Sequence, residues 1–229
     1  MPVASSDLSV RLKSVTAGYA REAPVFEAAT LDLRGPALVR VHGPNGGGKS
    51  TLIELLAGYL RPREGDVLVN GHPASSPTAH ARRRVCRTEP ALYPMMSVHD
   101  HLVFASRWVG ADPAVGLRRA ERYGLGPWMD MPAESLSTGN RRRLWIVQCT
   151  LGEFDTVILD EPFNGLDDDS LAVLLDELTT WGRKSLVVVI AHQPPAGLCA
   201  DRVVAWPPAP HLQDTVGHVA DAHEQGERP

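Results

Sequence analysis

The stretch His42-Gly43-Pro44-Asn45-Gly46-Gly47-Gly48-Lys49-Ser50-Thr51 decides the fold of this 229-residue chain. It follows residues 36–42, whose apolar and β-branched side chains are typical of a strand. It precedes residues 51–57, whose apolar spacing is typical of a helix. The stretch matches the pattern G-x-x-x-x-G-K-S/T between a strand and a helix, which is the context that a phosphate-binding loop requires.

Each residue type in this loop has a chemical task. Glycines let successive backbone N–H groups turn toward phosphate oxygens, and the following helix directs its positive end at the same anion. Lys49 has the length to reach the β- and γ-phosphates, while the Ser50 hydroxyl is a ligand for Mg²⁺. We therefore expect the loop to bind a nucleoside triphosphate with Mg²⁺. The expected binding residues are Gly43, Asn45, Gly46, Gly47, Gly48, Lys49, Ser50 and Thr51.

A second candidate site lies at the end of the apolar run 156–160, where Asp160 and Glu161 precede Pro162. Continuous apolar runs are typical of strands covered on both faces of a parallel sheet, and ligands bind at the carboxyl ends of such strands. Asp160 can then hold the same Mg²⁺ as Ser50, and Glu161 can orient and deprotonate an attacking water molecule.

The rest of the chain predicts an α/β fold. Residues 8–16 and 25–33 predict antiparallel strands, residues 63–71 predict a hairpin arm, and residues 185–191 predict another buried strand. Helical patterns cover 97–109, 112–123, 140–151 and 171–181. We expect a single P-loop NTPase domain over 1–205, with a mostly parallel sheet, an N-terminal antiparallel β arm and an α-helical subdomain inserted at about 90–150. Residues 206–229, rich in Pro, His, Asp and Gly, predict a disordered tail.

Composition excludes several classes of function. Lys plus Arg number 23 and Asp plus Glu number 27, so the net charge of −4 gives no electrostatic footprint for nucleic acid. The longest apolar run, Leu186 to Ala191, is far shorter than the roughly 18 residues of a membrane span. The three cysteines are odd in number and far apart, which favours reduced thiols in a cytoplasm.

The order of motifs resembles that of the nucleotide-binding subunit of an ABC transporter. The Walker A motif of that family corresponds to Gly43–Ser50 with Thr51, and its Walker B motif with the catalytic glutamate corresponds to Val157–Glu161. The signature L-S-G-G-Q corresponds to Leu136-Ser137-Thr138-Gly139-Asn140. The remaining correspondences are the D-loop at Gly165-Leu166-Asp167, the switch histidine at His192, and the adenine-stacking aromatic at Tyr19, for which Phe26 is a competing candidate.

The resemblance implies a mechanism that needs two ATPase subunits, as a homodimer or a heterodimer. ATP on the phosphate loop of one subunit is covered by the signature of the other, so Ser137, Gly139, Asn140 and Asp167 are expected to contact the partner's nucleotide. Ser137 and Gly139 precede a helix, whose start favours a phosphate. His192 is expected to contact the γ-phosphate. Hydrolysis then powers a transmembrane permease, which places the chain in the cytoplasm, peripheral on the inner face of the plasma membrane.

Two departures from the family pattern concern turnover. The glutamine of the Q-loop has no match, and Thr88 or Glu89 stands in its place. Glu89 has a carboxylate that can contact the metal or water, whereas Thr88 is too short to reach as glutamine does. The signature has Thr138 where the family has glycine, and Asn140 where it has glutamine. We expect weaker ATP-driven closure and reduced hydrolysis.

Two alternative functions stay open at this point. One is a soluble ABC ATPase outside transport, although the chain shows neither tandem cassettes nor a long coiled-coil insertion. The other is an ATP-sensing module with little turnover, which the missing glutamine and altered signature favour. Residues 93–98, Tyr-Pro-Met-Met-Ser-Val, fall where the family accepts a coupling helix from its membrane subunit, and core packing explains them equally well.

Overall fold

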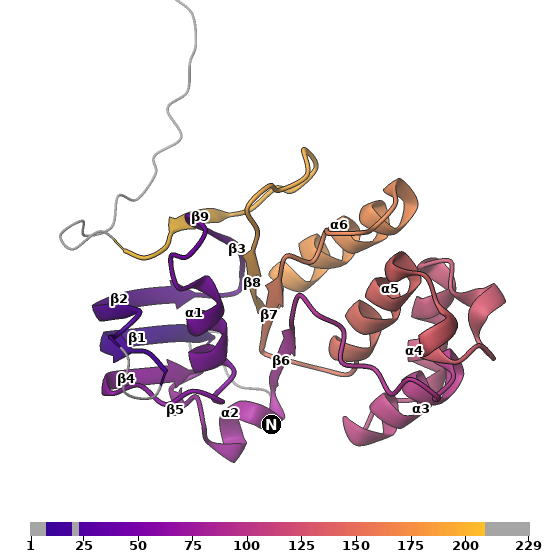
Figure 1. Cartoon of the computed structure of the whole chain (residues 1–229), viewed down its shortest axis with the longest axis horizontal. Helices are drawn as coiled ribbons and strands as arrows, with labels where there is room; N and C mark the ends of the chain where they lie inside the picture. The colour runs from indigo at the N-terminus through magenta and orange to yellow at the C-terminus, as the bar shows by residue number, and fades with distance from the viewer. Residues whose placement is uncertain (1–7, 20–22, 209–229) are drawn as a thin grey trace, which may run out of the picture.

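Two β-sheets form the centre of the structure, a computed structural model that describes residues 8–19 and 23–208 (Figure 1). One sheet has four strands in the order β2-β1-β4-β5, and the other has five in the order β6-β7-β8-β3-β9. The strands of the first sheet are β1 Ser9–Ala17, β2 Phe26–Arg34, β4 Glu64–Val69 and β5 His72–Pro73. The strands of the second are β3 Ala37–His42, β6 Arg83–Cys86, β7 Thr156–Asp160, β8 Leu186–Ile190 and β9 Arg202–Ala205.

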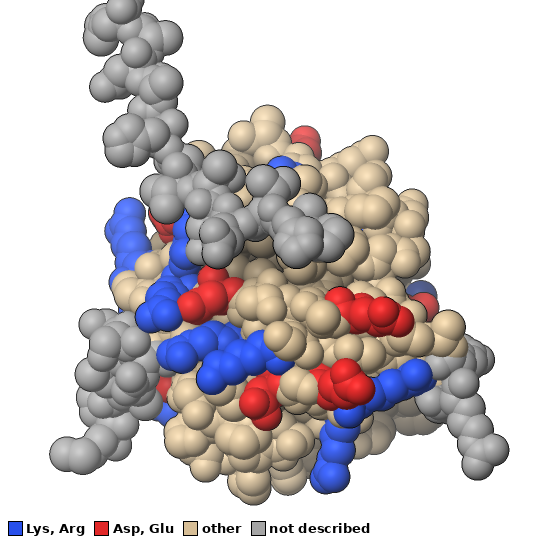
Figure 2. Space-filling model, turned by 90° about the vertical axis from the view of Figure 1, so that its left-hand side faces the viewer, with Lys and Arg blue, Asp and Glu red and all other residues tan. Residues whose placement is uncertain are grey.

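The four-stranded sheet is antiparallel, which confirms the predicted N-terminal β arm. Leu12 of β1 lies opposite Leu31 of β2 and Val67 of β4, so the three side chains share one face and are buried there. Intervening positions carry charge, and Asp32 forms ion pairs with Arg11 and Arg34. Figure 2 looks at the side of the molecule where this sheet lies and shows basic and acidic side chains interleaved over it.

The five-stranded sheet is parallel at every pairing and divides the core into two clusters. Ile158, Val188 and Val39 face the antiparallel sheet and helix α1 (Lys49–Leu56), whereas Val157 and Val187 face the helices of residues 98–182. This division follows from the two-residue period of a strand. Strands β7 and β8 are therefore buried on both faces, as their continuous apolar runs predicted.

The chain between β6 and β7 forms a cluster of helices that we call the helical group, on the right in Figure 1. The start of each α-helix is set by a side chain that accepts a hydrogen bond from the first turn: Ser97 for α3, Asp112 for α4 and Ser137 for α5. The elements of the helical group are α3 Val98–Trp108, α4 Pro113–Arg122, η2 Gly126–Trp128, η3 Ala133–Ser135 and α5 Thr138–Cys149. Outside it, α2 Pro77–Ala81 precedes β6, and α6 Asp168–Gly182 joins β7 to β8.

The carboxyl end of the domain differs from the predicted boundary at 205. Trp206 is 1% exposed, its backbone N–H donates to the His42 carbonyl (2.7 Å), and its ring meets Phe26 edge to face at 5.0 Å. The prediction was wrong for this residue because β9 pairs with β3 and carries Trp206 under the glycine loop, a long-range pairing that local composition does not report. Residues 209–229, the rest of the predicted tail, lie outside the described part of the chain. Among the described residues, no helix has the length and apolar character of a membrane span.

Candidate nucleotide-binding site

The glycine loop connects the end of β3 to the start of α1, as its sequence context predicted. Gly46 and Gly48 have φ angles of 76° and 79°, a left-handed conformation that glycine adopts without steric cost. A Cβ atom at Gly43 would lie 1.9 Å from the Trp206 carbonyl oxygen, so the close approach of the two backbones also requires glycine there. The loop shape thus depends on glycines that the motif supplies.

The loop borders a pocket of about 340 Å³, lined by Val25, Asn45, Gly46, Gly48, Lys49, Ser50 and Thr51. Helix α1 begins here with Gly48 at its N-cap and no side-chain capping hydrogen bond, so its first N–H groups are left for an anion. The Lys49 ammonium donates to the carbonyls of Gly43 and Pro44, both at 2.8 Å, which holds it beside the loop. The pocket therefore combines a cation, a hydroxyl and a helix N-terminus, the donors that a polyphosphate needs.

The two aromatic candidates for base stacking differ in exposure. Phe26 is 8% exposed and packs against Trp206, so its ring is part of the core. Tyr19 is 46% exposed, which leaves its ring accessible, although it does not line the pocket of the described chain. Val25 does line that pocket and was missed by the sequence analysis. The sequence offers no signal for it, because Val25 continues the apolar pattern of residues 25–33 and only the structure shows that it is exposed before β2.

The acidic pair lies where three neighbouring strands end. Asp160 is the last residue of β7, and its Oδ2 atom accepts a hydrogen bond from Thr88, which follows β6 (2.6 Å). Glu161 donates its N–H to the Ile190 carbonyl at the end of β8 (2.8 Å) and accepts from the His192 backbone N–H at Oε1 (2.9 Å). The structure thus brings residues from β6, β7 and β8 together. The side chains of Glu89 and His192 are exposed.

The residues at this edge fit Mg²⁺ better than a soft transition metal. Ser50 and Asp160 offer hard oxygen ligands, and Mg²⁺ is usually held by one or two carboxylates together with phosphate oxygens and water. No group of three or more His, Cys, Asp and Glu side chains gathers as a metal cluster within 8–19 and 23–208. A metal here would accordingly depend on a bound polyphosphate for most of its ligands.

The residues that match the signature and the D-loop meet at the N-termini of α5 and α6. Ser137 caps α5 by accepting from the Asn140 N–H (3.1 Å), and Asp167 caps α6 by accepting from the Ser170 N–H (3.0 Å). The hydrogen bonds from Ser170 hold the pKa of Asp167 below its usual range. A Cβ at Gly139 would lie 3.0 Å from the Gly165 carbonyl oxygen, so the two turns are in contact.

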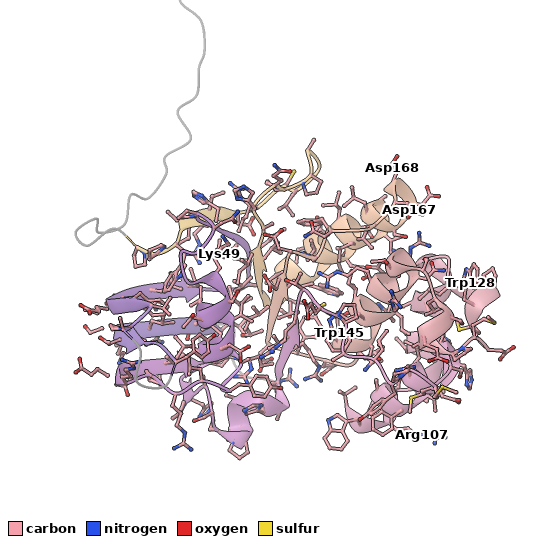
Figure 3. The ribbon with its side chains drawn as sticks, viewed as in Figure 1. Lys49, Arg107, Trp128, Trp145, Asp167 and Asp168 are labelled. Atoms are coloured by element: carbon pink, nitrogen blue, oxygen red, sulfur yellow. The ribbon has the colours of Figure 1, made fainter. Side chains whose placement is uncertain are left out.

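The capped N-termini of α5 and α6 lie apart from the glycine loop in the single chain. Figure 3 places Lys49 beside the antiparallel sheet and Asp167 at the far end of α6, well separated in the view. Neither Ser137, Gly139, Asn140 nor Asp167 lines the pocket at the glycine loop. The N-termini of α5 and α6 therefore lie apart from the glycine-loop pocket; we call the loop with the acidic pair one half-site and these capped N-termini the other.

Comparisons with known proteins find a matching family and several similar proteins. A family model described as "ABC transporter" matches residues 26–164. The cytochrome c biogenesis ATP-binding export protein CcmA 2 of Cupriavidus metallidurans is 34% identical over 74% of this chain and 82% of its own length. The taurine import ATP-binding protein TauB of Ruegeria pomeroyi is 29% identical over 79% of this chain and 69% of its own. A solved ATP-binding subunit of an ABC transporter superposes with a TM-score of 0.73 at 28% identity, covering 80% of this chain and 79% of that one.

Proposed function

The chain belongs to the ABC transporter family of ATPases, and from this premise we propose that it binds and hydrolyses MgATP together with a second cassette to power a separate membrane permease. The second cassette is another copy of this chain or a related one. In this proposal the chain is a peripheral subunit on the cytoplasmic side of the permease. Support comes from the family match over residues 26–164 and from the two half-sites described above.

The phosphate-loop half-site supplies the groups that hold and attack the nucleotide. Lys49 and the loop N–H groups bind the phosphates, while Ser50 and Asp160 hold Mg²⁺, which neutralises charge on the phosphoryl oxygens. Glu161 orients the attacking water and takes its proton. One oxygen of Glu161 is held by the His192 N–H, and its other oxygen accepts no hydrogen bond from the described residues, so it is available to water. The His192 ring contacts the γ-phosphate.

The separation of the half-sites is the observation that carries this proposal. The N-terminus of α5 and its cap Ser137 bind no part of their own chain's loop pocket, yet they offer the donors that a γ-phosphate prefers. Two chains related by a two-fold axis can place each Ser137 against the other's loop, and the same rotation completes both sites. ATP then favours the closed pair because it contacts both chains only there, and loss of the γ-phosphate removes that preference.

An exposed apolar surface on the helical group suits a helix of the permease. Tyr93 and Met95 are 60% and 77% exposed, and Phe104 and Trp108 project from α3 at 51% and 82%. The Tyr93 N–H donates to His101 Nε2 (3.0 Å), which fixes this segment on α3. Large exposed apolar side chains mark interaction sites, and adjacent methionines adapt to a partner's shape. We assign this surface to the permease subunit.

A second candidate, an ATP sensor with little turnover, is favoured by one observation. Thr88 or Glu89 stands where the family has glutamine; the Thr88 hydroxyl donates to Asp160 and the Glu89 side chain is exposed, so no glutamine amide is present to contact Mg²⁺ and water. A sensor would close on ATP and reopen slowly, so measured phosphate release discriminates between the two functions.

The test uses Glu161→Gln, which keeps nucleotide contacts but removes the base. We expect this variant to form an ATP-dependent dimer in gel filtration and to release phosphate at least tenfold more slowly than the wild type. Lys49→Ala should lose binding of a fluorescent ATP analogue, whereas Lys184→Ala, which changes an exposed lysine remote from the loop, should bind normally. Unchanged nucleotide affinity in Lys49→Ala would reject the site. Equal phosphate release by wild type and Glu161→Gln would favour the sensor. Co-purification with an integral membrane protein tests the permease.

A further inference from the structure

Arg142 lies buried between helix α5 and the ends of strands β6 and β7, with 4% of its surface exposed. Its guanidinium donates four hydrogen bonds, all to backbone carbonyls. Nη1 donates to Arg87 and Thr88, each at 2.7 Å, and Nη2 donates to Asp160 (2.9 Å) and Glu161 (2.8 Å). One side chain thus joins the segment after β6 to both residues of the acidic pair.

The choice of acceptors separates this arginine from an ordinary packing residue. Burying a guanidinium is costly unless its donors are satisfied; here carbonyls satisfy Nη1 and Nη2, whereas Nε has no partner among the described residues. Packing alone would be met by an apolar side chain of similar volume. The planar fork of arginine fits two pairs of carbonyls in fixed directions, which a lysine ammonium cannot reproduce. The four acceptors belong to two short segments, and both segments end at the proposed metal and water site.

Thr88 extends this connection from the backbone to a side chain. Arg142 holds the Thr88 carbonyl, and the Thr88 hydroxyl donates to Asp160 Oδ2 at 2.6 Å. Trp145, one turn further along α5, donates from Nε1 to the Arg87 carbonyl (3.0 Å), and Figure 3 shows it between the helical group and the sheet. The Asp160 carboxylate is therefore oriented through its own backbone and through Thr88.

We propose that Arg142 is a positioning residue that, with Thr88, orients Asp160 toward Mg²⁺ and Glu161 toward the attacking water. Because Arg142 lies on the helix capped by Ser137, it also joins the acidic pair of one half-site to the helix start that faces the second cassette. This inference rests on the proposed function for the roles of Asp160 and Glu161. It gives a role, through Asp160, to Thr88, which is one of the two residues at the position of the missing glutamine.

The test compares Arg142→Met, Arg142→Lys, Thr88→Val and Thr88→Ser in the full chain. The first readout is the fold gain in affinity for a fluorescent ATP analogue when Mg²⁺ replaces EDTA, which needs no turnover. We expect this gain to be at least fivefold smaller in Arg142→Met and Thr88→Val than in the wild type. The affinity measured in EDTA should stay within twofold of the wild-type value. Thr88→Ser, which keeps the hydroxyl, should retain the gain, and Arg142→Lys should be intermediate.

The second readout is steady-state hydrolysis. We expect kcat to fall at least tenfold in Arg142→Met with KM within threefold, because Lys49 and the loop still bind the phosphates. In the double variant, the fall in kcat should be smaller than the product of the falls caused by Arg142→Met and Thr88→Val separately, because both act through Asp160.

Arg83 provides the matched control. It is another buried arginine, 5% exposed, which donates to the carbonyls of Ala57 (2.6 Å) and Ala74 (2.8 Å) at the opposite end of β6. Arg83→Met should lower thermal stability without changing the Mg²⁺ gain. If Arg142 only supports the fold, Arg142→Met will match Arg83→Met in stability and in Mg²⁺ gain, and that result overturns the inference. Should Arg142→Met fail to fold, Arg142→Lys and Thr88→Val decide by the same readout.

The inference and the proposed function fail in different ways. A wild type that binds MgATP with a Mg²⁺ gain but does not hydrolyse it rejects the proposed turnover and leaves the Arg142 comparison intact. A wild type that hydrolyses ATP, with the Mg²⁺ gain unchanged in both Arg142→Met and Thr88→Val, rejects the inference alone. Absence of any Mg²⁺ gain in the wild type rejects the role of Asp160 and, with it, both.

Discussion

The Glu161 backbone lies in the left-handed region, with φ of 44°, directly after β7. For a residue with a Cβ this conformation costs about 1–2 kcal/mol. Hydrogen bonds at both ends of the residue compensate, through its N–H to Ile190 and its carboxylate from His192. Strain that is held in this way at a reacting group is typical of functional sites, because it aims the side chain where relaxed backbone would not.

This strain predicts an order of stabilities among inactive variants. Glu161→Ala and Glu161→Gly both lose the carboxylate and its hydrogen bond, but only glycine relieves the left-handed backbone. Glycine also gains entropy in the unfolded chain, which offsets part of the relief, so we expect Glu161→Gly to be more stable than Glu161→Ala by about 1 kcal/mol. Urea unfolding measures the difference. If Glu161→Gly is instead the less stable variant, as glycine's entropy alone predicts, Glu161 stores no backbone strain.

Residue roles that depend on local pattern could be predicted from sequence, and those that depend on tertiary contact could not. The glycine loop is recognisable because the groups that bind phosphate come from adjacent residues, so their spacing can be read in the sequence. Thr88 and Arg142 are separated by 54 positions, and only the alignment of α5 across the strand ends brings them together. Arg142 appears in sequence as the middle of three arginines, which gives no sign that it alone is buried among carbonyls.

At the level of elements, strands with an uninterrupted apolar run were predicted, and strands without an apolar pattern were not. Strands β7 and β8 are confirmed because burial on both faces leaves an uninterrupted apolar run. Strand β6 was missed because it begins with Arg83 and Arg84, whose side chains reach backbone carbonyls instead of forming an apolar pattern. Strand β9 has mostly exposed side chains and is held by its backbone pairing with β3.

The cap of α5 allows its structural and functional roles to be separated. Aspartate caps a helix as well as serine, so Ser137→Asp should keep the thermal stability of the wild type, whereas Ser137→Ala should lose about 1 kcal/mol. The added carboxylate repels a γ-phosphate, so we expect Ser137→Asp in the Glu161→Gln background to lose ATP-dependent dimerisation. Gel filtration with ATP checks this. A persistent dimer in Ser137→Asp would show that the α5 N-terminus does not meet the nucleotide.

The contribution of the α6 cap to folding stability depends on pH, and the pKa of Asp167 gives the sign of this dependence. Hydrogen bonds from Ser170 lower the pKa of Asp167 in the folded chain, and Arg143 pairs with its carboxylate. The carboxylate therefore adds stability at neutral pH, and this contribution is lost as pH falls below the usual aspartate range. We expect Asp167→Asn, which can still cap, to be slightly less stable than the wild type at pH 7, with a smaller difference at pH 3. Thermal unfolding at both pH values tests this, and a gap that grows on acidification would contradict it.

At the scale of the whole molecule, a buried polar cluster joins the helical group to α6. Arg119 of α4 donates to both carboxylate oxygens of Glu177 (2.9 and 2.8 Å) and to the Thr150 carbonyl (3.0 Å). The Tyr123 hydroxyl donates to the same carboxylate (2.9 Å). Burial and the neighbouring Glu177 raise the pKa of Tyr123, so the phenol stays protonated and remains a donor. These contacts join the helical group to α6, the two parts of the chain whose capped helix N-termini form one half-site.

This cluster predicts that removing one charged partner lowers stability more than replacing both partners with apolar residues. Glu177→Gln leaves the Arg119 charge buried without a counter-ion, so we expect a loss of about 3 kcal/mol in urea unfolding. The double variant Arg119→Met, Glu177→Leu removes both charges, so its free energy of unfolding should fall less than that of Glu177→Gln alone. Its helical group should be held less firmly against α6, because the directional hydrogen bonds are gone. Asp176→Asn breaks the exposed neighbouring pair with Arg122 and should cost under about 0.5 kcal/mol. If Glu177→Gln costs no more than Asp176→Asn, the cluster does not hold the helical group to α6, and orientation of α5 toward the second cassette must then depend on Arg142 and the apolar core.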